Sequence, residues 1–349
     1  MNTKIIKIDE NNIEKDKVKE ITKAFSDGKL VVIPTETVYG LGANGFDEEA
    51  CKNIFKAKGR PMDNPLILHI ADVEQIDELV SEIPQVAKDC MEMFWPGPLT
   101  MIFKKSDKMS DVVTARLDTV AIRMPSHKIA REILKDCKLP IAAPSANLSG
   151  RPSPTAFKHV DEDLNNKVDI IVDGGTSNVG IESTVIDMTS NPPMILRPGY
   201  VTYEDLKVLI PDLAVDNTTI DAKDKTVPKS PGQKYKHYAP KADAYCFVGN
   251  LEGVVKEVNK RVKENEDKKI AILATAETKD GYEGADLVID LGSRENMQEI
   301  AHNLFEALRK CDTEDIEIIY AEGFDFRGIG AGIMNRLLKA CGGKLVLGL

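Results

Sequence analysis

Two basic side chains close together, Lys58 and Arg60, are the first feature of the sequence that could do chemistry. They lie around Gly59, just past a predicted helix over 47–58, in a segment that two prolines restrict further. If this segment is extended, both cations project from one face, because side chains alternate along an extended chain. Arginine can grip two phosphate oxygens with its planar guanidinium, and lysine adds a compact point charge. The spacing therefore indicates either a phosphate-binding loop or a solvated basic loop.

Polar residues also follow the first predicted strands. Thr35 and Thr37 come directly after a buried strand, and ligands of open α/β sheets gather where strands end. Either the strand continues and both hydroxyls share a face, or the segment is a β-turn with capping hydroxyls. Nearby glycines, Gly40 and Gly42 among them, indicate that something approaches the backbone closely. His69 lies in an apolar run and is either a core histidine, which its neighbours favour, or a polar group in a pocket.

Arg123 ends a predicted strand in which Val120 and Ile122 face one side while Arg123 faces the other. An arginine on the second face of a buried strand needs an anionic partner. That partner is either a carboxylate of the protein or a carboxylate of a substrate.

Ser145 and Asn147 repeat this pattern at the end of another predicted strand, beside small alanines that leave room. A hydroxyl and an amide placed there suit phosphate oxygens or a metal-bound water. The alternative is an N-cap cluster for a helix that begins near Thr155. Glu182 to Thr184 form a further polar strand edge, and Arg197 is another well-placed cation. No Walker-type loop and no Ser-His-Asp order stands out, so the sequence identifies no general base.

The elements that must position these residues alternate between strand and helix, which predicts an α/β fold with an open sheet. A polar segment over 211–240 has no sustained hydrophobic period and predicts a linker. It separates a domain over 1–210 from a second alternation over 241–349, which predicts a smaller Rossmann-like α/β domain. The expected elements are strands over 30–33, 66–70, 99–103, 120–122, 141–143, 168–172, 183–188, 195–196, 244–248, 270–274, 287–291 and 316–320, and helices over 47–58, 73–80, 85–94, 129–134, from 152–154, 251–262, 295–311 and 331–340.

Composition limits the partners. The chain has 349 residues, 42% of them hydrophobic and 29% charged, which is enough for a large core and about two domains. Its formal net charge of -10 argues against a general electrostatic grip on nucleic acid, so no strong direct binding of nucleic acid is expected. The six cysteines lack disulfide or zinc spacing, and no apolar run of about eighteen residues occurs, so a reducing cytoplasm without a membrane anchor is expected.

Taken together, the motifs resemble those of the YrdC-domain family, over about residues 10 to 205. The remainder resembles the extra C-terminal domain of the long form of that family. The resemblance rests on the segments 34–42, 58–61, 64–66, 95–100, 123–125, 144–150 and 182–185, in that order. It implies a twisted open sheet of YrdC type with a deep positive cleft.

The resemblance also implies a nucleotidyltransferase. Its reaction would join L-threonine, bicarbonate and ATP, with Mg²⁺ on the triphosphate, into threonylcarbamoyl-adenylate and pyrophosphate. The product would pass to the tRNA threonylcarbamoyl-transfer machinery, which modifies the adenosine next to the anticodon. By the same resemblance, threonine would be held by Thr35, His69, Arg123, Ala143 and Ser183. ATP would be held by Lys58, Arg60, Asn64, Thr119, Ser145, Ser153, Arg197 and Tyr235, with Tyr235 closing over the nucleotide and no metal ligand supplied by the protein.

Two other classes of function, and one further motif, stay open. A YrdC-like domain could serve as an RNA-binding module, although the acidic balance and the single Trp95 argue against stacking on single strands. A similar domain also occurs in carbamoyl transfer for hydrogenase maturation, but within much longer chains.

In the tail, the segment from Gly328 to Arg336 places glycines before a helix. This pattern indicates either a nucleotide site or close helix packing or an interaction surface. A lone glycine cluster favours packing or an interaction surface.

Overall fold

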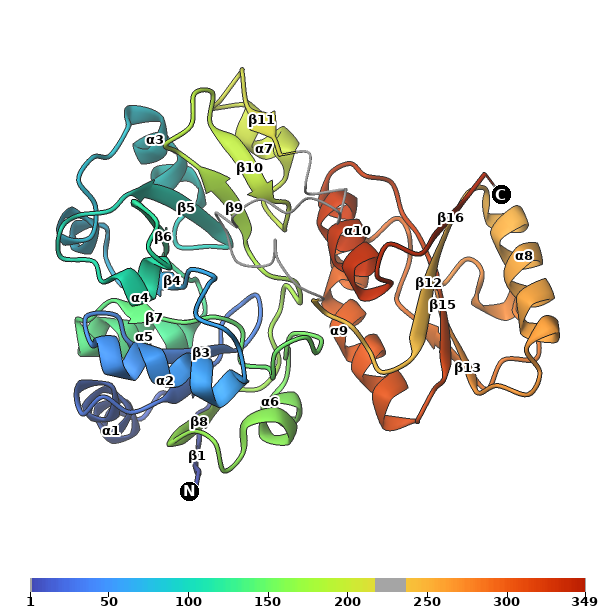
Figure 1. Cartoon of the computed structure of the whole chain (residues 1–349), viewed down its shortest axis with the longest axis horizontal. Helices are drawn as coiled ribbons and strands as arrows, with labels where there is room; N and C mark the ends of the chain where they lie inside the picture. The colour runs from blue at the N-terminus through green and yellow to red at the C-terminus, as the bar shows by residue number, and fades with distance from the viewer. Residues whose placement is uncertain (1, 217–236, 349) are drawn as a thin grey trace.

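The computed structural model describes residues 2–216 and 237–348, which form two sheets with helices against them (Figure 1). An eleven-stranded sheet has the order β1-β8-β2-β3-β7-β4-β6-β5-β9-β10-β11, and a five-stranded sheet has the order β14-β13-β15-β12-β16. The α/β class and the second, smaller α/β unit are therefore as the sequence predicts. The boundaries at 210 and 240 stay predictions, and β11 lies inside the predicted linker.

The larger sheet mixes parallel and antiparallel pairs, and the smaller one is parallel throughout. The strands of the larger sheet are β1 (Lys4–Lys7), β2 (Val31–Ile33), β3 (Gly40–Asn44), β4 (Ile67–His69), β5 (Leu99–Lys104), β6 (Thr119–Arg123), β7 (Ile141–Ala142), β8 (Ile170–Asp173), β9 (Thr184–Asp187), β10 (Met194–Arg197) and β11 (Ala214–Val215). Those of the smaller sheet are β12 (Asp243–Val248), β13 (Ile270–Ala274), β14 (Leu287–Asp290), β15 (Ile318–Glu322) and β16 (Leu345–Leu347).

Helices cover both sheets with apolar faces that form the cores. In the first unit they are α1 (Lys15–Ser26), α2 (Glu48–Lys58), α3 (Gln85–Phe94), α4 (Asp111–Thr114), α5 (Lys128–Cys137), α6 (Phe157–Leu164) and α7 (Tyr203–Lys207), with a 3-10 turn η1 (Val73–Glu78). In the second they are α8 (Leu251–Glu264), α9 (Met297–Thr313) and α10 (Ile329–Ala340), with η3 (Lys279–Gly281). Among the described residues, no helix combines the length and the apolar character needed to cross a membrane.

Helix α2 illustrates how local sequence fixes an element that carries the site. The Asp47 side chain accepts a hydrogen bond from the backbone N–H of Ala50 at its start, where acidic residues also suit the helix dipole. Gly59 ends the helix in the left-handed conformation at φ 61, which glycine adopts without steric cost. The helix therefore stops at Lys58, and this lysine is placed by a regular helix.

Strand β3 is the main element that the sequence analysis misses. Its residues Gly40 and Gly42 have low strand propensity, so propensity alone indicates a turn. A Cβ on Gly42 would lie 2.9 Å from Ile141 and 3.0 Å from the Phe25 ring. Packing of the protein against its own backbone therefore explains this glycine, in place of an approaching ligand.

Other differences lie at the ends of the first unit and before α6. Strand β1 and helix α1 were not predicted, and half of their residues are charged. The buried Val18, Ile21 and Phe25 of α1 stand at helical spacing and are the signal that could have found this helix. The prolines at 152 to 154 do not begin a helix, since α6 begins at Phe157, and the segment 73–80 forms the short η1.

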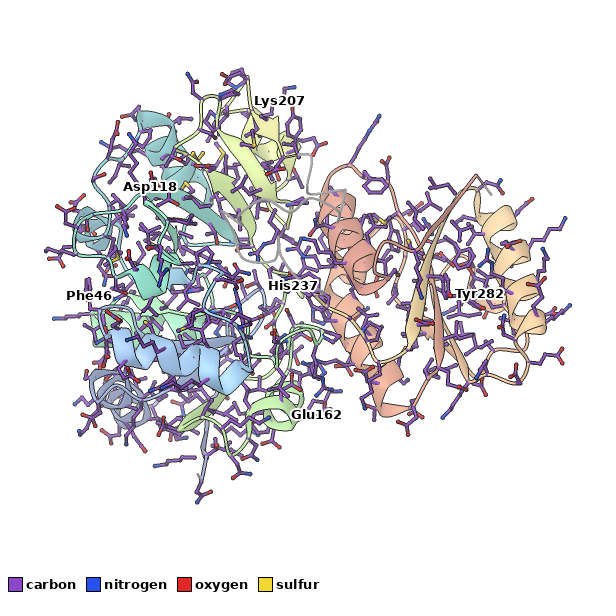
Figure 2. All side chains as sticks on the ribbon, in the orientation of Figure 1. Phe46, Asp118, Glu162, Lys207, His237 and Tyr282 are labelled. Atoms are coloured by element: carbon purple, nitrogen blue, oxygen red, sulfur yellow. The ribbon has the colours of Figure 1, made fainter. Side chains whose placement is uncertain are left out.

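The two units meet along α9 and α10, which lie between the smaller sheet and the larger unit (Figure 1). Side chains of both units gather there, near Glu162 and His237 (Figure 2). Arg309 of α9 donates to Asp163 Oδ2 at 2.8 Å, and Arg336 of α10 donates to Glu182 Oε2 at 2.9 Å. These are buried ion pairs, so both helices are anchored to the larger unit by charge as well as by apolar contact.

Candidate functional site

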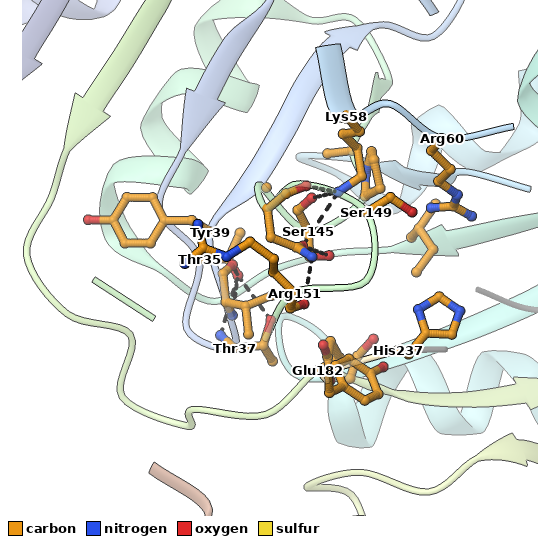
Figure 3. Close-up of a pocket in the computed structure, with 18 of the residues that line it drawn as sticks. Thr35, Thr37, Tyr39, Lys58, Arg60, Ser145, Ser149, Arg151, Glu182 and His237 are labelled. Atoms are coloured by element: carbon orange, nitrogen blue, oxygen red, sulfur yellow. Dashed lines mark hydrogen bonds between the residues drawn. The ribbon is translucent and has the colours of Figure 1, made fainter. Parts of the chain in front are cut away.

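A hollow lies at the ends of several strands of the larger sheet, with about 740 Å³ of space between atoms including its open mouth (Figure 3). The hollow is lined by most of the predicted site residues, namely Thr35, Lys58, Arg60, His69, Arg123, Ala143, Ser145, Ser183 and Arg197. Residues that are far apart in sequence thus converge on one space, as the strand-end argument predicts.

Lys58 is buried, with 3% of its surface exposed, and its ammonium group reaches the loop after β7 (Figure 3). Its Nζ donates to the carbonyl oxygens of Ser145 and Asn147, the latter at 2.6 Å. The expected extended stretch is wrong here, because Lys58 is helical and Gly59 turns the chain before Arg60. Both cations nevertheless line the same hollow. Burial, and then the charge of Arg60, lower the pKa of Lys58 well below its usual value, so an anion bound beside it would favour the protonated form.

Thr35 lies in a turn, because β2 ends at Ile33. Its Oγ1 accepts hydrogen bonds from the backbone N–H groups of Thr37 and Val38, both at 3.3 Å. The turn reading of the two threonines is therefore correct, and the strand does not continue. The turn also places Thr37 Oγ1 where it accepts a hydrogen bond from Arg123 Nη1 at 2.8 Å.

Arg123 has a carboxylate of the protein as its partner. Its Nη2 lies 2.6 Å from Glu36 Oε1, and both side chains are buried. Burial opposes ionisation of Glu36, but the charge of Arg123 together with hydrogen bonds to the carboxylate outweighs it and holds the pKa of that carboxyl below its usual value. Arg123 also donates to the carbonyl of Gly97 and lines the hollow, so its guanidinium is held in one orientation. The strand alternation that the sequence predicts is confirmed, with Val120 and Ile122 in the core.

The sequence left open whether His69 is a core histidine or a polar group in a pocket. Both descriptions apply, because His69 is buried and also lines the hollow. Its Nδ1 lies 3.2 Å from the carbonyl oxygen of Ile67. Burial, and then the neighbouring Arg123, lower the pKa of His69 to about 4. The imidazole is therefore neutral near neutral pH, and it adds no charge to a hollow that is already rich in cations.

Ser183 and Arg197 form the wall on the side of β9 and β10. Arg197 donates from Nε to the carbonyl of Ser183 at 3.0 Å and from Nη2 to its hydroxyl at 3.1 Å, and that hydroxyl lies 2.7 Å from Thr100 Oγ1. Burial lowers the pKa of Arg197 to about 10, so it stays a cation at neutral pH. This wall therefore presents a fixed charge and a fixed hydroxyl.

The other predicted site residues do not line the hollow. Asn64 is buried, and its backbone carbonyl accepts a hydrogen bond from Arg60 Nη2 at 3.4 Å. Thr119 lies at the opposite end of β6 from Arg123. Ser153 is one contact away, since its hydroxyl donates to the carboxylate of Glu182. Tyr235 lies outside the described residues.

Several lining residues were not among the predicted binders, including Glu182, Arg151 and Tyr238. The polar edge at 182–184 was noticed, but nothing in a single sequence marks a carboxylate as part of a cationic hollow. Tyr238 has φ 60 and is buried among residues of the second unit. Its place depends on how the units meet, which no local pattern encodes. Among the described residues, no group of three or more His, Cys, Asp or Glu side chains is placed to hold a metal ion.

Comparisons with known proteins agree with this arrangement. Residues 23–199 match the family model described as telomere recombination, which covers Sua5, YciO and YrdC proteins, and residues 201–342 match the C-terminal domain of threonylcarbamoyl-AMP synthase. A threonylcarbamoyl-AMP synthase of Pyrococcus abyssi is 45% identical over 96% of each chain, and one of Bacillus subtilis is 44% identical over 97% of this chain and 96% of that protein. The crystal structure of P. abyssi Sua5 complexed with L-threonine superposes with a TM-score of 0.94 at 44% identity, over 99% of both chains.

The depressed pKa of His69 predicts a specific dependence of stability on pH. Because the folded value of about 4 lies below the ordinary 6.5, the unfolded chain takes up this proton first as pH falls. His69 should therefore cost the wild type roughly 3 kcal/mol of unfolding free energy between pH 6.5 and 4. Urea unfolding of wild type and His69→Gln across this range should show that the unfolding free energy of the wild type falls relative to that of the variant as pH drops from 6.5 to 4. Parallel curves would mean that His69 titrates normally.

Proposed function

The chain belongs to the threonylcarbamoyl-AMP synthase family of transferase-type enzymes, and from this premise we propose the reaction that it carries out. It joins L-threonine, bicarbonate and ATP into threonylcarbamoyl-adenylate, with release of pyrophosphate and water. The adenylate then serves the tRNA machinery that modifies the adenosine beside the anticodon. The observation that carries the proposal is the single hollow in which Arg123, Lys58 and Arg197 converge.

The reaction needs several anions in one place. The amine of threonine takes up bicarbonate as a carbamate, and a carbamate oxygen attacks the α-phosphorus of ATP while pyrophosphate leaves. Threonine carboxylate, carbamate and triphosphate repel one another in water. Cations and oriented hydroxyls in a partly dry hollow offset that repulsion and stabilise the charge that grows on the leaving group. Holding three reactants together supplies a further part of the rate.

Threonine occupies the side of the hollow formed by the turn after β2 and the end of β6. Arg123 binds its carboxylate, since Glu36 and Thr37 fix the guanidinium before the substrate arrives. Thr35, Ala143 and Ser183 surround the rest of the amino acid. The neutral imidazole of His69 lets the amine stay close without charge repulsion.

ATP occupies the side formed by the end of α2, the loop after β7 and the end of β10. Lys58, Arg60, Ser145 and Arg197 line the hollow there and contact the phosphates. The roles of Asn64, Thr119, Ser153 and Tyr235 in nucleotide binding stay predictions. The first three do not line the hollow, and Tyr235 lies outside the described residues. A phosphate bound beside Lys58 favours the protonated form of this lysine, which burial alone disfavours.

Mg²⁺ enters with ATP. Magnesium prefers oxygen ligands and is often held mainly by substrate phosphates and water. The ion supplies charge neutralisation on the triphosphate, while the side chains of the hollow orient it. A cytoplasmic location fits the six cysteines, all of them among the described residues and all free thiols.

The proposed reaction predicts pyrophosphate release that requires threonine. Purified full-length protein with ATP, Mg²⁺ and bicarbonate should release pyrophosphate only after L-threonine is added, and EDTA should stop it. A coupled pyrophosphate assay measures the rate, and mass spectrometry identifies the adenylate. Turnover without threonine would contradict the proposal, as would tight RNA binding without any turnover.

The assignment of the threonine side predicts a split between the two substrates. Arg123→Ala should raise the KM for threonine about 10- to 100-fold, the range expected when a hydrogen-bonded charge is lost, with little change for ATP. Initial rates at varied threonine and at varied ATP measure the two constants. The variant Arg116→Ala, at an exposed arginine of the same unit, is the control and should match the wild type.

Loss of Arg123 alone also leaves Glu36 buried without its cation, which could unfold the protein. The double variant Arg123→Ala/Glu36→Gln removes both charges and should show the same rise in the KM for threonine. An unchanged KM in a folded double variant would remove Arg123 from the threonine site.

A further inference from the structure

Helix α10 of the second unit reaches the wall of the hollow. A Cβ on its Gly332 would lie 3.1 Å from the backbone of Gly199 and 3.1 Å from the side chain of Ile181. A Cβ at these distances would be tighter than nearly all real contacts, so the larger unit would have to shift by a few tenths of an ångström to accept one. The glycine cluster noted in the sequence thus serves close packing, and one turn further along α10 comes Arg336.

Arg336 is completely buried and points into the larger unit. Its Nε donates to Glu182 Oε2 at 2.9 Å, and its Nη2 donates to the backbone carbonyl of Glu182 at 3.0 Å. Its Nη1 donates to the backbone carbonyl of Pro198. One guanidinium thus ties down the residue before Ser183 and the residue after Arg197, two predicted binders that line the hollow.

Glu182 itself lines the hollow, where its carboxylate would oppose the anions of the substrates (Figure 3). Arg336 offsets that charge from behind, and the hydroxyl of Ser153 donates to the other carboxylate oxygen. Burial opposes ionisation of Glu182, but the charges of Arg336 and then Arg197, together with hydrogen bonds from Ser153 and Arg336, outweigh it and hold the pKa of this carboxyl below its usual value. Without Arg336, a buried carboxylate would face the phosphates with less compensation.

We propose that Arg336, from the second unit, is a positioning residue of the reaction: it neutralises Glu182 in the wall of the hollow and fixes Ser183 and Arg197 for the substrates. This inference rests on the proposed function, since it concerns the same site. In this proposal the second unit contributes a residue that the catalytic site needs. A displacement of about 1 Å at a reacting group can cost 100-fold in rate, so the backbone contacts of Arg336 are of the right kind to matter.

The test uses full-length protein and four variants in the pyrophosphate assay. Arg336→Met should lower kcat/KM about 100-fold in protein that stays folded below its thermal midpoint. Arg336→Lys keeps the charge but lacks the planar guanidinium, and its kcat/KM should lie between those of Arg336→Met and the wild type. Lys158→Ala removes the exposed ion pair with Glu306 between the same two units, and it is the control that should match the wild type.

The double variant Arg336→Met/Glu182→Gln separates positioning from mere folding. Because it removes the uncompensated carboxylate, it should regain at least about tenfold in kcat/KM over Arg336→Met. Both variants are assayed below their thermal midpoints and their rates are divided by the folded fraction, so that recovered stability does not count as recovered activity. A folded Arg336→Met variant within about twofold of the wild type would overturn the inference. A double variant no more active than Arg336→Met would overturn it as well. Failure of the wild type to release pyrophosphate with threonine would instead contradict the proposed function.

Discussion

Buried positive charge around one hollow is the constraint on which the rest of the structure depends. A cation taken out of water is costly unless oxygen atoms surround it. Here the protein supplies those atoms from its own backbone and from two carboxylates. Lys58 is held by carbonyl oxygens, Arg123 by Glu36, and Arg197 by Ser183. These contacts keep the cations in place while leaving them on the wall of the hollow, where anionic substrates can share them.

The oxygen atoms come from segments that only the folded chain brings together. The acceptors for Lys58 lie 87 and 89 residues away in sequence, and Glu182 meets its arginine across 154 residues. The charge balance of the hollow therefore depends on the docking of α10 as much as on the larger sheet. This ties the two units into one functional body, because neither the carboxylate nor the cation that offsets it is satisfied by its own unit alone.

Much of this could be predicted from sequence where the signal is local. Helix α2, the strand β6 with its two faces, the polar residues after β2 and β7 and the polar residues at the start of β9 all follow from periodicity, caps and turn chemistry. The prediction failed where long-range packing decides the outcome. Propensity indicates a turn where glycine-rich β3 forms, and the close packing of Phe25 and Ile141 against Gly42 explains why glycine stands there. Lys58 and Arg60 do not share the expected extended stretch, because α2 runs to Lys58 and Gly59 turns the chain. The family resemblance assigned Thr119 and Asn64 to ATP binding, but neither lines the hollow. Which side chains reach the hollow depends on the arrangement of the whole sheet. Arg336 was within a noted motif, and only the meeting of the two units reveals its partner.

The central claim is that one cationic hollow holds an amino acid and a nucleotide side by side. A crystal structure of the full chain with L-threonine and a non-hydrolysable ATP analogue tests it most directly. The account predicts threonine carboxylate on Arg123, phosphates on Lys58, Arg60 and Arg197, and the amine facing the α-phosphorus. Threonine and nucleotide bound on separate surfaces would contradict it. So would a threonine carboxylate that does not contact Arg123 while Arg123 stays paired with Glu36.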